Sequence, residues 1–186
     1  MMAERGVQVD HSNFFQKFTP KLEATFRKGK KNPVGKSWRM DETYIKIKGQ
    51  WKYLYRAVDK EGQTVDFLLT IYRDKKAIRQ YGLPDKMTID KSGANTADLD
   101  ALNDEPNVNI EVRQSKYLNN LIEQDHRAIR RIVRPMLGLK SFRTARITLQ
   151  GIELMHMIQK GQMVSGDGQN LSAAGRFYWL PETKSE

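Results

Sequence analysis

The sequence predicts an α/β domain built on a five-stranded mixed sheet with flanking helices. Three segments in the first half of the chain alternate apolar and polar residues as strands do, and turn residues separate them. Two shorter strand-like segments follow, and the last third has the apolar spacing of helices. With 186 residues, of which 39% are hydrophobic, the chain is long enough for one main domain with a substantial core.

The composition narrows the classes of function. There are 32 Lys and Arg residues against 22 Asp and Glu, a net charge of +10, which favours a polyanionic partner and most often nucleic acid. The absence of cysteine excludes disulfides, thiol nucleophiles and Cys-based zinc sites. No apolar run approaches the roughly 20 residues that cross a bilayer, and no signal-peptide pattern begins the chain, so we expect a cytoplasmic protein without a membrane partner.

The predicted strands of the first half form an antiparallel meander. Residues 37–48 alternate well enough for a first strand, and Gly49-Gln50 provides a short turn. Residues 51–59 continue as a second strand rich in aromatics. A turn signal at residues 59–62 then leads into a third strand over 63–72.

The middle of the chain predicts shorter elements. A charged helix of about two turns is expected over residues 73–81. Residues 86–90 form a fourth strand that ends at an acidic residue, and residues 108–113 form a fifth. The acidic residues gathered between Asp98 and Glu105 predict a solvent-exposed loop.

Two helices are predicted in the last third. The first covers about 115–134 and ends before Pro135. The second spans about 141–160, and the tail from Val164 ends in an aromatic cluster at 177–179 that should pack on the body. The expected buried stripe of the second helix is Phe142, Ala145, Leu149, Ile152, Met155 and Ile158.

Positive charge is concentrated in one part of the chain. From His126 to Ile152 there are seven Lys or Arg residues and no acidic residue. Glu123 shares a helical face with Arg127, Arg130 and Arg134, so an acidic residue opens onto a basic track that a phosphate backbone could follow. The alternative interpretation is a solvated basic face. A second cluster over 27–31 predicts a flexible, phosphate-binding linker.

Three carboxylates have positions that suit a shared site. The order of predicted elements is that of a ribonuclease-H-like fold, in which the first strand is central and neighbours the fourth. Asp41 lies in the first strand, Asp90 ends the fourth and Glu123 lies on a later helix. Converging carboxylates repel each other unless a divalent cation neutralises them, and Mg²⁺ or Mn²⁺ suits oxygen ligands. Each residue also has an ordinary interpretation. Asp41 would be a surface acid at a strand edge, Asp90 a turn former and Glu123 a solvated helix residue.

Several segments carry a family resemblance. Residues 38–59 (WRMDETYIKIKGQWKYLYRAVD), 88–97 (TIDKSGANTA) and 113–162 resemble a DDE transposase of bacterial insertion sequences, of the insertion sequence family six type. The match runs from about Val34 to Met163. It implies an RNase-H-like catalytic core of the retroviral integrase superfamily. It also implies that Asp41, Asp90 and Glu123 bind the metal, with 32 residues between the last two.

The resemblance implies DNA contacts as well. In the family, Lys or Arg residues on the helix of the third acidic residue lie close to the element's terminal DNA. The residues that match them here are Arg127, Arg130 and Arg131, and less directly His126. The predicted DNA-binding residues are Arg127, Arg130, Arg131, Arg134, Lys140, Lys91, Lys30 and Lys31.

The chemistry implied by the resemblance is metal-dependent DNA cleavage followed by strand transfer. Two Mg²⁺ (or Mn²⁺) ions would align a water that cuts at the element end, and the freed 3′-OH would then attack target DNA. The implied partners are the terminal inverted repeats, target DNA and further copies of the chain, at the bacterial nucleoid.

Two departures from the family lead us to expect a truncated, internally shortened copy. Residues 1–12 resemble only the turn and the start of the second helix of a helix-turn-helix, and 73–82 is shorter than in relatives. The predicted organisation is a helix-turn-helix remnant with a basic linker (1–33), a catalytic domain (34–163) and a tail (164–186). The alternatives are a decayed DNA-binding remnant with impaired catalysis and a free-standing RNase-H-like nuclease.

Overall fold

The computed structural model describes residues 11–72, 82–90, 93–115, 120–136, 139–164 and 172–180. The chain divides into two compact units, which we describe separately. The first is continuous, from Pro33 to Leu139, and the second combines residues 1–32 with 140–186. This grouping differs from the predicted organisation, which placed residues 140–163 with the catalytic domain. The reason is that helix α5 (Phe142–Gln159) packs on helix α1 (His11–Thr25) of the N-terminal segment.

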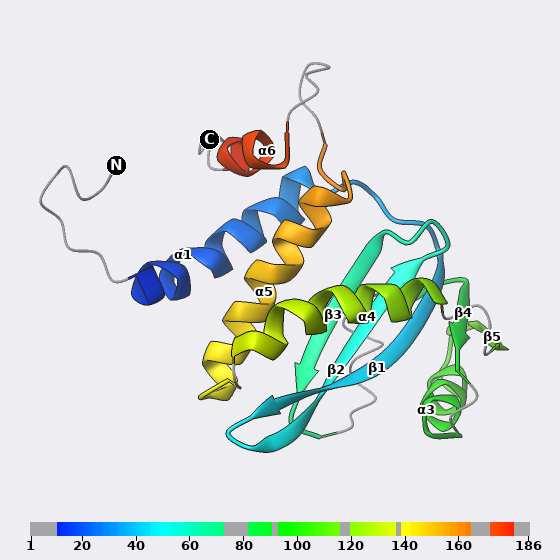
Figure 1. The fold of residues 1–186 in the computed structure, drawn as a ribbon. Coiled ribbons are helices and arrows are strands. Elements are labelled where there is room, and N and C mark those ends of the chain that lie inside the picture. The colour runs from blue at the N-terminus through cyan, green and yellow to red at the C-terminus, as the bar shows by residue number, and fades with distance from the viewer. Residues whose placement is uncertain are drawn as a thin grey trace, which may run out of the picture. The chain divides into compact units, whose positions relative to one another are not determined.

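The continuous unit is built on a five-stranded mixed sheet with the spatial order β3-β2-β1-β4-β5 (Figure 1). The strands are β1 (Ser37–Ile47), β2 (Gln50–Asp59), β3 (Thr64–Thr70), β4 (Lys86–Ile89) and β5 (Glu111–Gln114). β1, β2 and β3 pair antiparallel as a meander, whereas β4 runs parallel to β1 and β5 parallel to β4. The predicted ribonuclease-H-like sheet, with its first strand central and next to the fourth, is confirmed.

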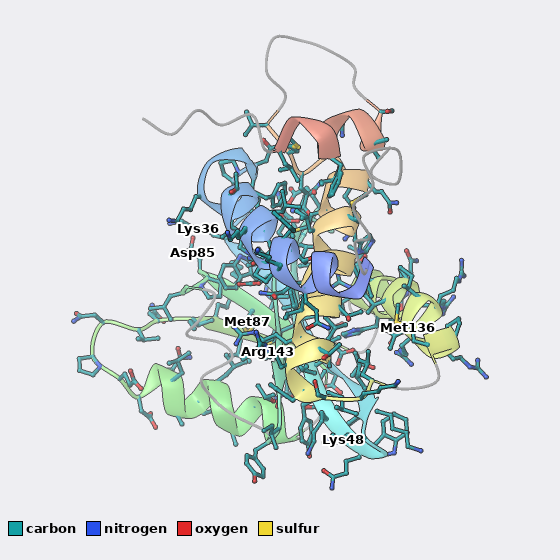
Figure 2. All side chains as sticks on the ribbon, turned by 90° about the vertical axis from the view of Figure 1, so that its left-hand side faces the viewer. Lys36, Lys48, Asp85, Met87, Met136 and Arg143 are labelled. Atoms are coloured by element: carbon teal, nitrogen blue, oxygen red, sulfur yellow. The ribbon has the colours of Figure 1, made fainter. Side chains whose placement is uncertain are left out.

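Local geometry explains how β1 meets its two neighbours. Lys48 and Gly49 both have positive φ, at 48° and 78°, as a two-residue hairpin turn between twisted strands requires. At the other end of β1, the Asp85 N–H donates to the Lys36 carbonyl at 3.0 Å. The Lys36 ammonium and the Asp85 carboxylate lie side by side there, 3.9 Å apart (Figure 2). These contacts fix where the parallel pairing of β1 with β4 begins.

Helices cover the two faces of this sheet. Helix α3 (Gly93–Asn103) buries Leu99 and Leu102 in one cluster with Trp38 and Met40 of β1. Helix α4 (Asn120–Val133) contacts β1 and β2 (Figure 1). Because successive residues of a strand point to opposite faces, Met40 faces α3 and Asp41 faces the side that α4 covers.

Two details of this unit differ from the sequence prediction. The expected acidic loop at 98–105 is wrong, because its first six residues belong to α3. Leu99 and Leu102, spaced three apart, supply a buried face. β5 starts at Glu111, three residues later than predicted. The expected helix over 73–81 lies outside the described residues.

The second unit is helical. It contains α1, the π-helical turn η2 (Phe26–Lys30), α5 and α6 (Ala173–Trp179). Phe26 is fully buried in a cluster with Leu154 and Leu180. The predicted flexible linker at 27–31 is therefore wrong through Lys30: Phe26 anchors this turn in the core, and Arg27 forms an ion pair with Glu23.

The two ends of α5 show how the rest of this unit is held. The Ser141 hydroxyl accepts from the Thr144 N–H and caps the start of α5, which follows the predicted helix closely. The tail packs on α5 through α6, with Phe177 against the same apolar cluster. Within the described residues, no helix combines the length and the apolar character that a membrane span needs.

Candidate active site

Asp41 lies on β1, and Asp90 directly follows β4, the parallel strand beside it. The register pairs Trp38 with Met87 and Arg39 with Thr88, and it ends there, two positions before Asp41 and Asp90. Asp41 faces the side of the sheet that α4 covers.

Glu123 approaches from the helix. It lies in the first turn of α4, where an acidic side chain also suits the positive end of the helix dipole. A cavity of about 330 Å³ is lined by Asp41, Glu123, Arg127 and Arg130. The structure therefore brings an acidic residue of the central strand and one of the helix to the same cavity, with two arginines on the wall.

The donor set suits an open metal site rather than a closed cage. In the part of the chain that the structure describes, no group of three or more acidic or histidine side chains converges closely enough to enclose an ion. Mg²⁺ is usually bound by one or two carboxylates, with water and substrate phosphate oxygens completing the octahedron. Asp41 and Glu123, the two carboxylates that line the cavity, suit Mg²⁺ or Mn²⁺ in that manner, whereas Asp90 is not among the lining residues.

A buried polar cluster lies beneath this cavity. His126 of α4 is only 1% exposed, and its Nε2 lies 3.5 Å from the Asp41 Oδ2. The neighbouring Asp125 places its Oδ2 3.5 Å from the Nη2 of Arg56, a fully buried residue of β2. The sequence prediction missed Arg56 and Asp125. The available signal was the helical spacing of Ile122, Asp125, His126 and Ile129, which puts two ionisable residues on the buried stripe.

A second, larger cavity of about 800 Å³ adjoins the first, because Arg130 lines both. Its walls come from the β1–β2 hairpin and the C-terminal half of α4: Thr43, Tyr44, Ile45, Lys46, Trp51, Arg130, Val133 and Arg134. Trp51 is 63% exposed, and the Lys46 ammonium lies 5.7 Å from the centre of its ring. The prediction treated these aromatics only as strand formers, although an exposed Trp beside a turn is a signal for a binding surface.

The remaining predicted DNA-binding residues fall in different places. Arg131 is exposed on α4 but lines neither cavity. Lys140 is exposed and belongs, with Lys30 and Lys31, to the helical unit. Lys91 lies outside the described residues.

Comparisons with known proteins agree with this fold. The family model of the DDE domain matches residues 35–162. The sheet order and this match define the class of protein, one with a DDE domain.

The relatives narrow the class. The transposase for insertion sequence-like element IS431mec of Staphylococcus aureus (strain Mu50) is 41% identical over 175 residues, covering 86% of this chain and 75% of the relative. The transposase for insertion sequence element IS257 in transposon Tn4003 of Staphylococcus aureus is 42% identical, covering 84% and 73%. The chain belongs to the DDE transposases of bacterial insertion sequences, of the insertion sequence family six type.

Solved structures show a weaker likeness. The catalytic core domain of HTLV-2 integrase, solved in a dimeric form with magnesium, superposes with a TM-score of 0.47 at 14% identity. The superposition covers 77% of this chain and 97% of that one.

Proposed function

We propose that this chain is a DNA transposase that cuts at the ends of a mobile element and joins the freed 3′-OH to target DNA. The observation that carries the proposal is the meeting of Asp41 and Glu123 at one cavity, and Asp90 directly follows β4, the strand beside β1. Family membership supports the same reaction class. The chain has no cysteine, and phosphoryl transfer of this kind needs no protein nucleophile.

Asp41, Asp90 and Glu123 would hold two Mg²⁺ or Mn²⁺ ions. Bound there, the ions would supply charge neutralisation and polarisation at the scissile phosphodiester. Asp41 is held by the central strand β1 and Glu123 by a helix that packs on β1 and β2, and Asp90 would reach the ions from the end of β4. His126 contacts the Asp41 carboxylate from the buried face of α4.

The arginines on the cavity wall would bind the DNA backbone. Arg127 and Arg130 lie beside the acidic residues, so a phosphate neutralised by them would sit next to the proposed metal ligands. Arg130 and Arg134 continue this surface into the larger cavity, where Tyr44 and Trp51 offer aromatic faces to bases. The proposed partners are the terminal inverted repeats, target DNA and a second copy of the chain, at the nucleoid.

The test is a cleavage and strand-transfer assay. The substrate is an oligonucleotide duplex with the inverted repeats that flank the gene, in the presence of Mg²⁺ or Mn²⁺ and a supercoiled target. We expect a nick at the element end and a joined product, both abolished by EDTA and by Asp41→Asn. Glu42→Gln is the matched control, because Glu42 is the next residue of β1 and points to the other face.

The other outcomes separate the alternatives. Salt-sensitive DNA binding with no metal-dependent cutting would contradict the proposal and identify a DNA-binding remnant. Cleavage without joining, with no preference for the element ends, would instead identify a nuclease. Equal loss of activity in the Asp41 and Glu42 variants would remove Asp41 from the metal site.

A further inference from the structure

The buried face of α4 is unusual for an amphipathic helix. Its buried residues are Ile122, Asp125, His126 and Ile129, so two ionisable side chains stand between two isoleucines. Each of the two contacts a different strand: His126 lies against Asp41 of β1, and Asp125 against Arg56 of β2. The helix thus contacts the sheet through ionisable side chains at two adjacent positions.

Arg56 stands at the centre of this arrangement. It is fully buried, and the β1–β2 register pairs it directly with Asp41. Directly paired residues of antiparallel strands have their side chains on the same face, a few ångströms apart. The Nη2 of Arg56 also donates to the Thr64 Oγ1 of β3 at 3.3 Å. One guanidinium therefore connects β2, β3 and α4 next to a proposed metal ligand.

Net stability alone is a poor explanation for such a pair. Taking a carboxylate and a guanidinium out of water costs about as much as their mutual attraction returns, and apolar replacements are often as stable. What a buried pair provides better than isoleucines is a single permitted arrangement, as polar residues do when they fix register in helical assemblies. Apolar side chains tolerate sliding and rotation, whereas Asp125 has to face Arg56.

The rotation of α4 matters for the site. Glu123 lies two residues before Asp125 and lines the cavity with Asp41, Arg127 and Arg130. With 3.6 residues per turn, a shift by one residue would turn Glu123 by about 100° around the helix axis. Such a turn would move its carboxylate away from Asp41.

We propose that Arg56 and Asp125 are positioning residues that set the rotation of α4, so that Glu123 faces Asp41 across the cavity. The inference rests on the proposed function, because the geometry that it protects is that of the proposed metal ligands. Neither residue is assigned to contact the metal or the DNA.

The decisive experiment replaces the pair by apolar residues. Arg56→Met and Asp125→Leu, made singly, should each lower the melting temperature, because each leaves one buried charge without its partner. The double variant should regain a melting temperature near that of the native chain. A pair that serves stability alone would then also regain cleavage.

Positioning predicts a different result. At saturating DNA, the single-turnover cleavage rate of the double variant should stay at least about tenfold below the native rate, while its DNA affinity stays within about twofold. Cleavage within about twofold of the native rate in a stable double variant would overturn the proposal. If the double variant does not fold, Asp125→Asn takes its place, because it keeps the shape and removes the charge. The same tenfold loss supports positioning, and a native rate refutes it.

A second measurement does not depend on activity. Because the chain has no cysteine, spin labels can be attached to single cysteines introduced at Gln124 of α4 and Gln50 of β2, both exposed. We expect one narrow distance distribution in the native background and a shifted or broadened one in the double variant. An unchanged distribution would refute positioning even if cleavage is confirmed.

Failure of the proposed function can be told apart from failure of the positioning role. If the native chain does not cleave but the double variant shifts the label distances, the positioning role stands and the catalytic proposal fails. Glu111→Gln is the matched control, because it removes exposed ion pairs with Lys86 and Arg113 elsewhere in the same unit. It should leave both the cleavage rate and the label distances unchanged.

Discussion

The two faces of the sheet are filled by different chemistry. Against α3 the contacts are apolar, with Leu99 and Leu102 packed on Trp38 and Met40. Against α4 the buried stripe includes Asp125 and His126, which lie on Arg56 and Asp41. Both faces bury apolar side chains, yet only the second one adds buried ionisable side chains that each contact a particular residue of the sheet.

The two faces therefore have different roles, one in the stability of the fold and the other in the geometry of the proposed site. An apolar face is stabilised in proportion to the area that it buries, and it accepts small adjustments of the helix. A face of charged contacts adds little net stability but defines where the helix stands. The proposed metal ligands emerge on the second face, where small displacements would matter most.

The largest expected effect is the loss of activity in Glu123→Gln. The change removes the charge that a metal ligand needs and leaves the buried stripe of α4 intact. We expect the cleavage rate to fall at least about 100-fold, since substitutions even of groups that only support metal ligands reach that size. The melting temperature should hardly change. Gln124→Ala, the next residue on the helix and also exposed, should cleave normally.

On the apolar face that packs against α3, we expect a substitution to reduce the stability of the fold. Leu99→Ala leaves a cavity against Trp38 and Met40, and we expect the free energy of unfolding to fall by about 2–5 kcal/mol. Urea denaturation measures it. Leu121→Ala, the same change at a half-exposed position of α4, should cost less than about 0.5 kcal/mol. If the two substitutions cost the same, α3 does not provide the core that the structure shows.

The sheet could be predicted from the sequence because its signals are local. Alternation in residues 37–48 and the turn at Gly49 define the meander, and strand order then sets β1, which carries Asp41, beside β4, which Asp90 directly follows. Helix α3 was missed because Asp98, Asp100 and Asp104 suggested a loop. Its helical character depends on the burial of Leu99, which only the tertiary contact with β1 explains.

The support of the candidate site could not be predicted. A cation in the middle of a strand normally indicates a solvated edge, so Arg56 gives no sign of being fully buried. Its burial makes sense only beside Asp125, which lies on a helix far along the chain. Asp41 and Glu123 were predicted from their positions in the expected elements and from a family resemblance, whereas the contacts that hold them come from packing.

A smaller effect, on DNA affinity, should distinguish two neighbouring arginines of α4. Arg130 lines both cavities and Arg131 lines neither, although both are exposed. We expect Arg130→Gln to weaken DNA binding and to lower the slope of log affinity against log salt by about 0.9, the value for one lost phosphate contact. Arg131→Gln should change the slope less. Equal changes would mean that DNA binding is spread over the whole basic helix and is not centred on the cavities.

The smallest expected effect lies at the edge of the sheet, away from both buried faces. Lys86 and Arg113 donate to the Glu111 carboxylate, at 2.8 Å and 2.6 Å, and hold its pKa below the ordinary value. A lowered pKa means that the folded chain favours the charged form. The stabilisation is therefore present above the pKa of the unfolded chain and is lost as the pH falls through the folded-state pKa.

Glu111→Gln should accordingly lower the melting temperature slightly at about pH 7, and the difference should disappear at a low pH, below the folded-state pKa of Glu111, where both chains carry a neutral side chain. The effect should be small because the group is exposed, and added salt should reduce it further. Thermal unfolding at the two pH values, with and without salt, measures it. A large effect at neutral pH would show that β5 depends on this ion pair for its place in the sheet. The edge of the sheet would then contribute to the stability of this unit together with its two buried faces.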